Sequence, residues 1–587
     1  MANLSKIKRE KMLDYLEKLK EINNDDENIR AITEIENALN EKKYGLVWEE
    51  HSEKVDEELV HSIPIFVEDE NRKITVNKDK PYNFLLEGDN LHSLKLLEKT
   101  HKGKIDVIYI DPPYNTGNKD FIYDDSFVDK TDGYAHSKWL SFMEKRLTIA
   151  RELLSNDGVI FISIDDNEQA QLKLLCDEIF GEENLVSILC VELSKTQGMK
   201  VKSAQEGRVV KNHEYIYVYC KNIEFAYVSR QPLFDSTDIW DSHFNKALIK
   251  CDETLILSSI NDFIKEQHSY MYEEFAKNGL LENNKINEKS IRNGILINDK
   301  IRKFLYETVA DNIVQEMACS ISAPANVKID LKKNDVVEYK KYYLTQTSNG
   351  KLRQYRPLSE NIKQSDEYNS TVERVTIRGA LWKGFYSDMM NVQKEGTMDF
   401  KNGKKPIRLI AQLNKWSNRK NAIVLDFFAG SGTTGHAVMQ LNKEDGGQRK
   451  YILCTNNENN ICEEVTYQRL KNIQEDLPHN LKYYKTEFIP KFSDEEDSIS
   501  DKMMKHIKEL IELEYHIELD GKRYLILGDE DKLGETIEKI ENNGSIFVHS
   551  GIFLSRSDQR ILDEKQVNVI EIPEYYFRDE LKEVGEL

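Results

Sequence analysis

The stretch Lys104–Gly117, KIDVIYIDPPYNTG, passes from an apolar, β-branched segment directly into Asp111-Pro112-Pro113-Tyr114. The apolar run is typical of a strand buried on both faces, and the prolines end it because they lack backbone N–H donors. A turn needs one proline, and it needs neither the carboxylate nor the aromatic ring. The stretch therefore predicts a buried strand whose carboxyl end carries a functional loop.

Apolar strand-like runs alternate with amphipathic helical segments on both sides of this stretch. Strands are expected within 82–90, 104–115, 158–166 and 213–222, with helices at 91–101, 137–154 and 167–181. The alternation resumes with a helix at 404–416, a strand, glycine turn and helix at 421–442, and a strand at 449–457. This rhythm predicts an α/β fold with a doubly wound, mostly parallel, Rossmann-like sheet.

The alternation is interrupted between its two halves. Residues 223–378 are irregular and rich in Tyr, Asn and Lys, so the simplest account is one α/β domain that contains an inserted module. Residues 1–50 have helical periodicity, and 490–587, set off by the acidic linker SDEEDSISD, suggest a small α+β appendage. The expected segments are 1–50, 51–222, 223–378, 379–489 and 490–587.

Composition describes a globular chain of about two to four domains. Of 587 residues, 39% are hydrophobic and 32% charged, and no apolar run is long enough to predict a transmembrane helix. The charged N-terminus has no apolar signal core, so a cytoplasmic location is expected. Seven cysteines without a Cys-x-x-Cys pair predict reduced thiols, not a zinc or disulfide framework.

Charge is unevenly distributed along the chain. The net charge of -21 argues against nucleic-acid binding, because phosphates usually meet basic surfaces. From Lys340 to Lys383, however, nine Lys and Arg face four acidic residues, a local balance of +5. A basic middle within an acidic frame remains compatible with DNA.

A glycine-rich turn forms the second motif. In IVLDFFAGSGTTG, Ile423–Gly435, an apolar strand ends at Asp426 and leads through Gly430 and Gly432 into a helical segment. Such a turn lets a ligand approach the backbone, with the free N–H groups of the helix beside it. It is not a phosphate-binding P-loop, because no Gly-Lys-Ser/Thr follows. A nucleotide-like cofactor site and a tight structural turn both fit it.

The Asp-Pro-Pro-Tyr motif suits the activation of an exocyclic amine. The amine of adenine is a poor nucleophile because its lone pair is delocalised into the ring, and acceptors for its N–H groups would free that pair. Asp111 offers one acceptor, and the prolines fix the Pro112 carbonyl as a second. Tyr114 offers a face on which a base removed from the duplex could stack. The alternative is a Pro-Pro strand end with a chance Asp and Tyr.

Together the two motifs resemble the DNA amino-methyltransferases that use S-adenosylmethionine. The catalytic motif precedes the cofactor glycines, which is the circularly permuted order of the β class, with the target-recognition domain between them. The phrases DPPYNTGNKDFIYDDSF, DGYAHSKWLSFMEKRLTIARELL and DFFAGSGTTGHAVMQLN look like the modification (Mod) subunit of type III restriction–modification systems. The resemblance covers roughly Tyr82–Asn222 and Leu381–Leu470, and it implies that 51–222 is the catalytic half and 379–489 the cofactor-binding half.

The resemblance assigns roles to individual residues. It implies that catalysis involves the motif Asp111, Pro112, Pro113 and Tyr114, and that the cofactor contacts Asp89, Asn90, Lys405, Asp426, Phe428, Ala429, Gly430, Gly432 and Thr433. The family's acid for the cofactor ribose is matched only by Glu458, which follows Asn456 and Asn457 later than the pattern requires. Asp as the first motif residue favours adenine N6, whereas Ser is usual for cytosine N4.

Other residues are weaker candidates. Trp139 is expected to be buried, Lys138 to be solvated or functional, and His213 and Glu214 to start a strand or to approach the target base. Because direct base readout depends on groove geometry, DNA contacts are proposed only from basic character. The candidates are Lys195, Lys200, Lys202, Arg353, Arg356, Arg374 and Arg378.

The expected function is N6 methylation of a flipped adenine in duplex DNA, with S-adenosylmethionine as cofactor and no metal. The family further implies a homodimer and a helicase–endonuclease (Res) partner, and no membrane association is expected. Three alternatives remain: a solitary DNA methyltransferase, a methyltransferase for RNA or protein amide nitrogens, and an inactive DNA-binding specificity subunit.

Overall fold

The computed structural model describes most of the chain after residue 47. It covers 48–587 apart from 118–119, 121, 124–125, 130, 196–204, 206, 208, 238, 252–253, 320, 323, 333–334, 367–371, 398–403, 492–497, 550, 573–575, 577 and 584–587. Before residue 48 it describes 12–13, 15–16, 18–20, 29–30, 32–33 and 35–36, all of them helical. The rest of the expected N-terminal helices lies outside the described residues.

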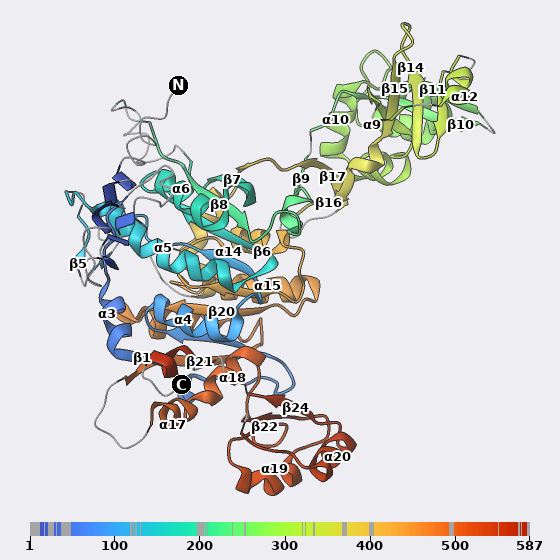
Figure 1. Cartoon of the computed structure of the whole chain (residues 1–587). Helices are drawn as coiled ribbons and strands as arrows, with labels where there is room; N and C mark the ends of the chain where they lie inside the picture. Colours follow the sequence, from blue (N-terminus) through green and yellow to red (C-terminus); the bar gives the residue numbers. More distant parts are fainter. Residues whose placement is uncertain are drawn as a thin grey trace.

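A ten-stranded sheet forms the centre of the molecule (Figure 1). Its strands, in spatial order, are β1 (Ser62–Glu68), β21 (Asn480–Pro490), β2 (Tyr82–Glu87), β20 (Lys450–Thr455), β19 (Ile423–Asp426), β3 (Ile105–Ile110), β6 (Leu154–Ile164), β8 (His213–Cys220), β7 (Leu185–Glu192) and β18 (Leu381–Trp382). Strands β21 to β6 run parallel, while β1 and β8 are antiparallel to their neighbours. The mostly parallel α/β fold predicted from the sequence is confirmed.

Helices cover both faces of this sheet. One face carries α4 (Asn90–His101), α5 (Ala135–Leu153) and α6 (Gln169–Phe180), and the other α14 (Ile407–Trp416), α15 (Thr433–Asp445) and α16 (Tyr467–Asn472). In β3, Ile108 and Ile110 join the first core, whereas Val107 and Tyr109 join the second. Because successive side chains point to opposite faces, a continuous apolar run is needed where both faces are covered.

The inserted module has a regular structure of its own, although its sequence gave no clear periodicity. Its six-stranded sheet is formed, in spatial order, by β11 (Thr254–Ser259), β10 (Phe244–Cys251), β12 (Ile313–Ala318), β15 (Leu352–Pro357), β14 (Tyr342–Gln346) and β13 (Val337–Tyr339). Every adjacent pair is antiparallel. Helices α8 (Ile260–Gln267), α9 (Ser269–Lys277), α10 (Glu288–Ile297), α11 (Asp299–Lys303) and α12 (Ala325–Asp330) accompany it, and most of them share a separate apolar core.

The module projects from the main domain on a narrow stem (Figure 1). The stem is a three-stranded sheet of β16 (Ile362–Gln364), β17 (Val372–Ile377) and β9 (Phe234–Ser236). Strands β9 and β17 are antiparallel, with Phe234 opposite Ile377. The entering and leaving segments of the module therefore lie side by side.

The C-terminal region differs from the α+β arrangement expected. Its strands β22 (Tyr524–Leu527), β23 (Ser545–Val548) and β24 (Asn568–Glu571) are parallel and are connected through α19 (Leu533–Lys539) and α20 (Arg556–Glu564). This is a small α/β unit, since parallel neighbours require crossover connections. It lies at the end of the molecule opposite the inserted module (Figure 1).

A buried ionic cluster joins the main sheet to α18 (Ile507–Tyr515), the helix that precedes the C-terminal unit. The fully buried ammonium of Lys482 on β21 lies 2.7 Å from Glu512 and 2.8 Å from Glu68. The remaining helices are α3 (Lys54–His61), α13 (Tyr386–Asn391), α17 (Ile499–Met504) and α21 (Arg578–Glu583). Within the described part of the chain, no helix combines the length and apolar character needed to cross a membrane.

Candidate active site

The predicted site residues follow four neighbouring parallel strands. Strands β2, β20, β19 and β3 lie side by side, so their carboxyl ends meet at one edge of the sheet. The loops that start there contain Asp89, Glu458, Gly430 and Asp111. Ligands of open α/β sheets bind at this edge, and the fold brings the two sequence motifs together there.

Four polar side chains form a cluster after β3, which we call the Asp111 cluster: Asp111, Tyr114, Glu214 and Lys405. The Tyr114 hydroxyl lies 2.7 Å from Asp111 Oδ1 and 3.0 Å from Glu214 Oε2. Lys405 Nζ donates to the Tyr114 oxygen at 2.7 Å and to Glu214 Oε2 at 2.6 Å, and lies 3.3 Å from Asp111 Oδ1. A phenol has one proton to donate, so Asp111 and Glu214 compete for it.

Burial and charge act in opposite directions in this cluster. Burial raises the pKa of Asp111 above its usual value, and the Lys405 ammonium opposes that rise only in part. Burial also disfavours the charged form of Lys405, but Asp111 and Glu214 outweigh that effect, so the pKa of Lys405 is raised. The pKa of Tyr114 is raised well above its usual value by burial and by the two carboxylates, so its hydroxyl stays neutral.

Helix α5 and the loop before α6 hold the loop after β3 in place. Trp139 Nε1 donates to the Pro113 carbonyl at 2.7 Å, so this predicted buried tryptophan also anchors the motif. Asn115 adopts a left-handed φ of 56° and donates to Glu168 Oε1 at 2.6 Å. With Pro112 buried, the backbone of the motif has little freedom to move.

The glycine loop after β19 is organised around a second aspartate. Asp426 is 2% exposed and accepts hydrogen bonds from the Phe428 amide at 3.0 Å and the Thr434 hydroxyl at 2.5 Å. Burial raises the pKa of Asp426 to about 7, although both hydrogen bonds oppose the shift. Gly430 and Gly432 have φ values of 48° and 74°, a region that glycine adopts without strain.

Two residues that the sequence analysis missed support this loop. Thr466 Oγ1 donates to the Gly430 carbonyl at 2.5 Å, and the buried Arg469 donates to Thr433 Oγ1 at 2.8 Å. The Thr433 hydroxyl, predicted to bond a cofactor, is thus engaged within the protein. No local motif marks Thr466 or Arg469, because both lie after β20, on segments that reach the loop only in the folded chain.

Asp89 and Asn90 begin the helix after β2. Asp89 caps α4 by accepting from the Leu91 amide at 2.7 Å, and Asn90 Nδ2 donates to the Phe427 carbonyl at 2.8 Å. The buried Arg146 connects the pair, with Nε 2.5 Å from Asn90 Oδ1 and a terminal nitrogen 3.3 Å from Asp89 Oδ1. This part of the edge is therefore tied to the glycine strand.

Three other predicted cofactor residues take different positions. The ring of Phe428 packs with Phe142 at a centroid distance of 5.9 Å, and the Ala429 amide donates to the Cys454 carbonyl at 3.1 Å. Glu458 is exposed at the start of a short turn, Glu458–Asn460, after β20. Its assignment to a ribose stays a prediction.

The predicted DNA-binding residues are dispersed. Lys195 lies 3.9 Å from the ring centre of Tyr386, and Arg353 pairs with Glu316 at 3.2 Å. Arg356 forms an ion pair with Glu360. Lys200 and Lys202 lie outside the described residues.

Arg374 and Arg378 are placed at the stem of the module, and their surroundings argue against the predicted DNA contacts. Arg374 is 6% exposed and donates to the Ile239 carbonyl. Arg378 pairs with Asp235, donates to Gln412 Oε1 at 2.7 Å and lies 4.8 Å from the ring centre of Trp382. The Arg378 guanidinium thus connects the stem to α14 of the main domain, whereas that of Arg374 contacts a residue of the inserted module itself.

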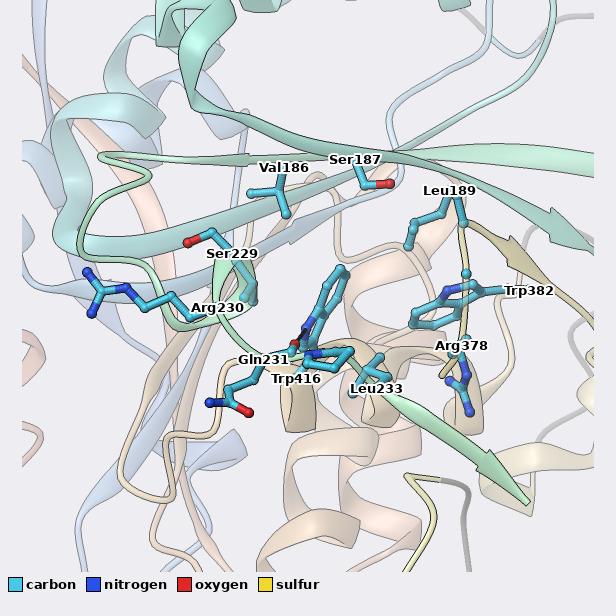
Figure 2. A pocket seen from close by; sticks show the side chains of 14 residues that line it. Val186, Ser187, Leu189, Ser229, Arg230, Gln231, Leu233, Arg378, Trp382 and Trp416 are labelled. Atoms are coloured by element: carbon cyan, nitrogen blue, oxygen red, sulfur yellow. Dashed lines mark hydrogen bonds between the residues drawn. The ribbon is translucent and has the colours of Figure 1, made fainter. Parts of the chain in front are cut away.

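Arg378 also borders a pocket of about 360 Å³ (Figure 2). Leu233, which precedes β9, and Trp382 of β18 line it together with Trp416 of α14. The Trp416 ring lies 6.2 Å from that of Trp382, and its Nε1 donates to the Gln231 carbonyl at 3.1 Å. The pocket belongs to the junction and not to the carboxyl edge that holds Asp111.

Within the described residues, no group of three or more His, Cys, Asp or Glu side chains is arranged to hold a metal ion. The polar groups of the carboxyl edge are used instead in the Asp111 cluster and in the support of the glycine loop. This arrangement can position a neutral ligand or a cationic one beside carboxylates.

Comparison with known proteins gives a consistent result. A family model described as DNA methylase matches residues 105–466. The EcoPI Mod subunit of Escherichia phage P1, a type III restriction-modification enzyme, is 31% identical over 457 residues, which cover 73% of this chain and 65% of the relative. The probable type III enzyme HindVI Mod subunit of Haemophilus influenzae is 30% identical, with 67% and 50% covered. The type II methyltransferase M.KpnI of Klebsiella pneumoniae is 30% identical, with 68% and 90% covered.

The chain thus matches between half and two thirds of the length of these two Mod subunits. It matches nine tenths of the type II methyltransferase. In each case the match covers about two thirds or more of this chain.

Proposed function

This chain belongs to the DNA methylase family, whose model matches residues 105–466, and on that premise we propose that it methylates N6 of adenine in duplex DNA. The observation that carries the proposal is the placement of the Asp111 loop and the glycine loop at the ends of adjacent strands, β3 and β19. An amine-activating motif and a cofactor turn thereby share one edge of the sheet. Asp as the first motif residue favours adenine over cytosine.

S-adenosylmethionine is the proposed cofactor, and when bound it supplies a methyl group activated by a positively charged sulfur. The glycine loop fits such a group. A Cβ built at Gly430 would meet no atom nearer than the Phe428 carbonyl oxygen at 3.8 Å, so this side of the turn is open for a ligand. At Gly432 the same atom would lie 3.1 Å from Thr466, so that side is packed.

The cofactor-holding residues would be those that surround the open side of the turn. We assign Gly430 and Phe428 to the cofactor, and Asp89 to the same edge. The carboxylate of Asp89 suits the positive charge of the proposed cofactor, and the backbone groups of the glycine turn suit a polar ligand that approaches the chain closely. Thr433 is assigned to the support of the turn because Arg469 occupies its hydroxyl.

The residues after β3 would activate the target nitrogen. A flipped adenine would direct an N–H toward Asp111 and another toward the Pro112 carbonyl, while Tyr114 provides a stacking face. The nitrogen lone pair would then form the new N–C bond with the methyl group that the cofactor supplies, whose C–S bond would break, and the extra proton on nitrogen would leave toward Asp111 or solvent. No covalent bond to the protein is required.

The inserted module is proposed to select the DNA sequence. It projects from the main domain on the stem, in which the entering strand β9 pairs with the leaving strand β17 (Figure 1). The names of two relatives, the EcoPI and HindVI Mod subunits, suggest a type III system, in which this chain would act as a homodimer with a helicase–endonuclease partner.

A solitary methyltransferase is the second candidate. It is favoured by the type II methyltransferase M.KpnI, because this chain covers 90% of that protein but only 65% of the EcoPI Mod subunit. Co-purification with the product of a neighbouring helicase-like gene, and ATP-dependent DNA cleavage by the complex, would support the type III assignment. Full methylation without any such partner gene would favour the solitary enzyme.

The decisive experiment is expression in a host that lacks DNA methylation, followed by genome-wide mapping of modified bases by single-molecule sequencing. We expect N6-methyladenine at one short recognition sequence. Asp111→Ala, expressed in parallel, should give unmodified DNA. Only N4-methylcytosine, or no modified base with the folded wild-type chain, would contradict the proposed function.

A further inference from the structure

Lys405 and Glu214 lie far from the Asp-Pro-Pro-Tyr motif in sequence but contact it in the fold. We infer that these two residues set the charge state of Asp111 with opposite effects, the Lys405 ammonium favouring the ionised carboxyl and Glu214 opposing it, and that Lys405 keeps Tyr114 oriented during methyl transfer. The inference rests on the proposed function and deepens it. It also changes the role of Lys405, which the sequence analysis assigned to cofactor binding.

The geometry brings three separate segments to one point. Glu214 starts β8, which is antiparallel to β6, so its first residues reach the carboxyl edge of the parallel strands. Lys405 precedes α14, and its side chain is only 11% exposed. It is directed at the Tyr114 hydroxyl, 2.7 Å away, instead of the glycine loop.

The distances from Lys405 Nζ show that the two carboxylates interact with it differently. Lys405 Nζ lies 2.6 Å from Glu214 and 3.3 Å from Asp111, so its shorter hydrogen bond is made to Glu214. The positive charge still acts on Asp111 through space, since a cation at this distance favours the ionised carboxyl. Lys405 thereby favours the charged form of Asp111 while making its shorter hydrogen bond to Glu214.

The oxygens of Asp111 are used unequally. Among the described residues, its hydrogen bond from Tyr114 and its contact with Lys405 both involve Oδ1. Oδ2 is therefore the oxygen suited to accept an N–H of the target base. Glu214 limits how closely Lys405 approaches Asp111, which preserves that acceptor.

Five groups set the charge state of Asp111 from the elements around it. The ammonium of Lys405 favours ionisation, while Glu214 opposes it. The Tyr114 hydroxyl favours ionisation by donating to Oδ1. The buried groups of Tyr109 on β3 and Asp426 on β19 also interact with the Asp111 charge. Lys405 and Glu214 thus act in opposite directions on the ionisation of Asp111.

Because Lys405 and Glu214 affect the ionisation of Asp111 in opposite directions, removing each charge should shift the pH dependence of methylation in opposite directions. A purely structural role of the two residues would not produce such shifts. The measurement is single-turnover methylation of unmethylated genomic DNA as a function of pH, because the acid limb of the profile reports ionisation of the catalytic carboxyl. Lys405→Met should move that limb to higher pH and reduce the rate on the acid side by roughly tenfold or more, with partial recovery at alkaline pH. Glu214→Gln should move the limb to lower pH.

Matched variants separate charge from packing. Lys405→Arg keeps the positive charge and should leave the limb near its wild-type position. Lys404→Met removes the neighbouring lysine, which is 3% exposed and contacts the Glu395 carbonyl, and should not move the limb. Thermal unfolding and the Kd for S-adenosylmethionine are measured for each variant.

The outcomes are distinct. Opposite displacements of the limb, with unchanged cofactor affinity, support the opposite effects of Lys405 and Glu214 on Asp111. A uniform loss of rate at every pH would overturn it, and so would a weaker cofactor affinity of Lys405→Met with an unmoved limb, which would restore the cofactor role. Absence of methylation by the folded wild-type chain would overturn the proposed function, and this inference with it.

Discussion

Asp111 and Asp426 stand at corresponding places on neighbouring parallel strands, but their environments differ. Asp111 ends β3 and faces the Lys405 ammonium at 3.3 Å, with its side chain 21% exposed. Asp426 ends β19, is 2% exposed and receives neutral hydrogen bonds from Thr434 and the Phe428 amide. Among the residues that the structure describes, a cation lies beside Asp111, and no ion pair is formed by Asp426.

This difference separates a reactive group from an organising one. A carboxylate that must accept a substrate N–H needs an ionised form and an available lone pair; in the Asp111 cluster, Lys405 favours the ionised form against the effect of burial, and the contacts with Tyr114 and Lys405 are made through Oδ1. Asp426 spends both oxygens on the loop that follows it. The same residue type at the same edge thus stands beside a cation after β3 and organises the following loop after β19, which fits the proposed catalytic role of Asp111.

The largest expected effect tests the reactive side of the comparison. Asp111→Asn should lower kcat by about a thousandfold, because the amide loses the charge and one acceptor position at the target nitrogen. Transfer of a radiolabelled methyl group to DNA measures it. Cofactor affinity should stay close to that of the wild type. A variant that keeps wild-type kcat would remove Asp111 from the mechanism.

The next effect tests the organising side through pH. Because the folded pKa of Asp426, about 7, lies above the usual 3.8, the folded state binds this proton more tightly than the unfolded state. The stability that the protonated Asp426 contributes is therefore fully present below pH 3.8 and is lost as the pH rises from 3.8 through about 7.

Asp426→Asn removes that loss while retaining an acceptor for Thr434. As the pH increases from 3.8 to about 7, the free energy of unfolding of the variant should rise relative to that of the wild type, by up to about 4 kcal/mol. Above pH 7 the difference should stay constant. Urea unfolding at a series of pH values measures the difference. If the difference in unfolding free energy between variant and wild type does not vary with pH, ionisation of Asp426 does not destabilise the folded state.

Smaller effects distinguish the two sides of the glycine turn. Gly432→Ala introduces a side chain at φ 74° against Thr466, so a loss of stability of about 1–2 kcal/mol or more is expected. Gly430→Ala, at φ 48°, enters open space and should cost less stability but more cofactor affinity. Thermal unfolding and cofactor titration compare the two, and equal profiles would contradict the assignment of an open side.

The smallest effect concerns the support of the Asp111 loop. Trp139→Phe keeps most of the buried ring but removes the 2.7 Å hydrogen bond to the Pro113 carbonyl. A loss of about 1 kcal/mol in unfolding free energy is expected, with a modest decrease in kcat. Chemical denaturation and methyl transfer on the same preparation measure both. Unchanged values would mean that the prolines alone fix the loop.

The sequence predicted the parts of the site that depend on local chemistry. Apolar runs that end in Asp111 and Asp426 located both loops, because strand burial and turn residues are local signals. The partners of those loops were assigned less well. Lys405 was assigned to the cofactor, and Thr466 and Arg469 were missed, because only the packing of distant segments brings them near the motifs.

Two further differences have physical causes. Arg374 and Arg378 were predicted to contact DNA from their charge, but charge alone does not distinguish a ligand contact from a buried pair with Asp235 or a backbone carbonyl. The C-terminal unit was expected to be α+β, because its short strands do not reveal whether their pairing is parallel.

The paired strands of the stem have a consequence for evolution. Phe234 and Ile377 face each other across one strand spacing, so the chain leaves the main domain and returns to it at nearly the same place. A foreign segment whose own ends lie equally close can replace everything between them without changing the register of the central sheet. Recombination at the stem would exchange the inserted module while the central sheet and the loops at its carboxyl edge are inherited intact.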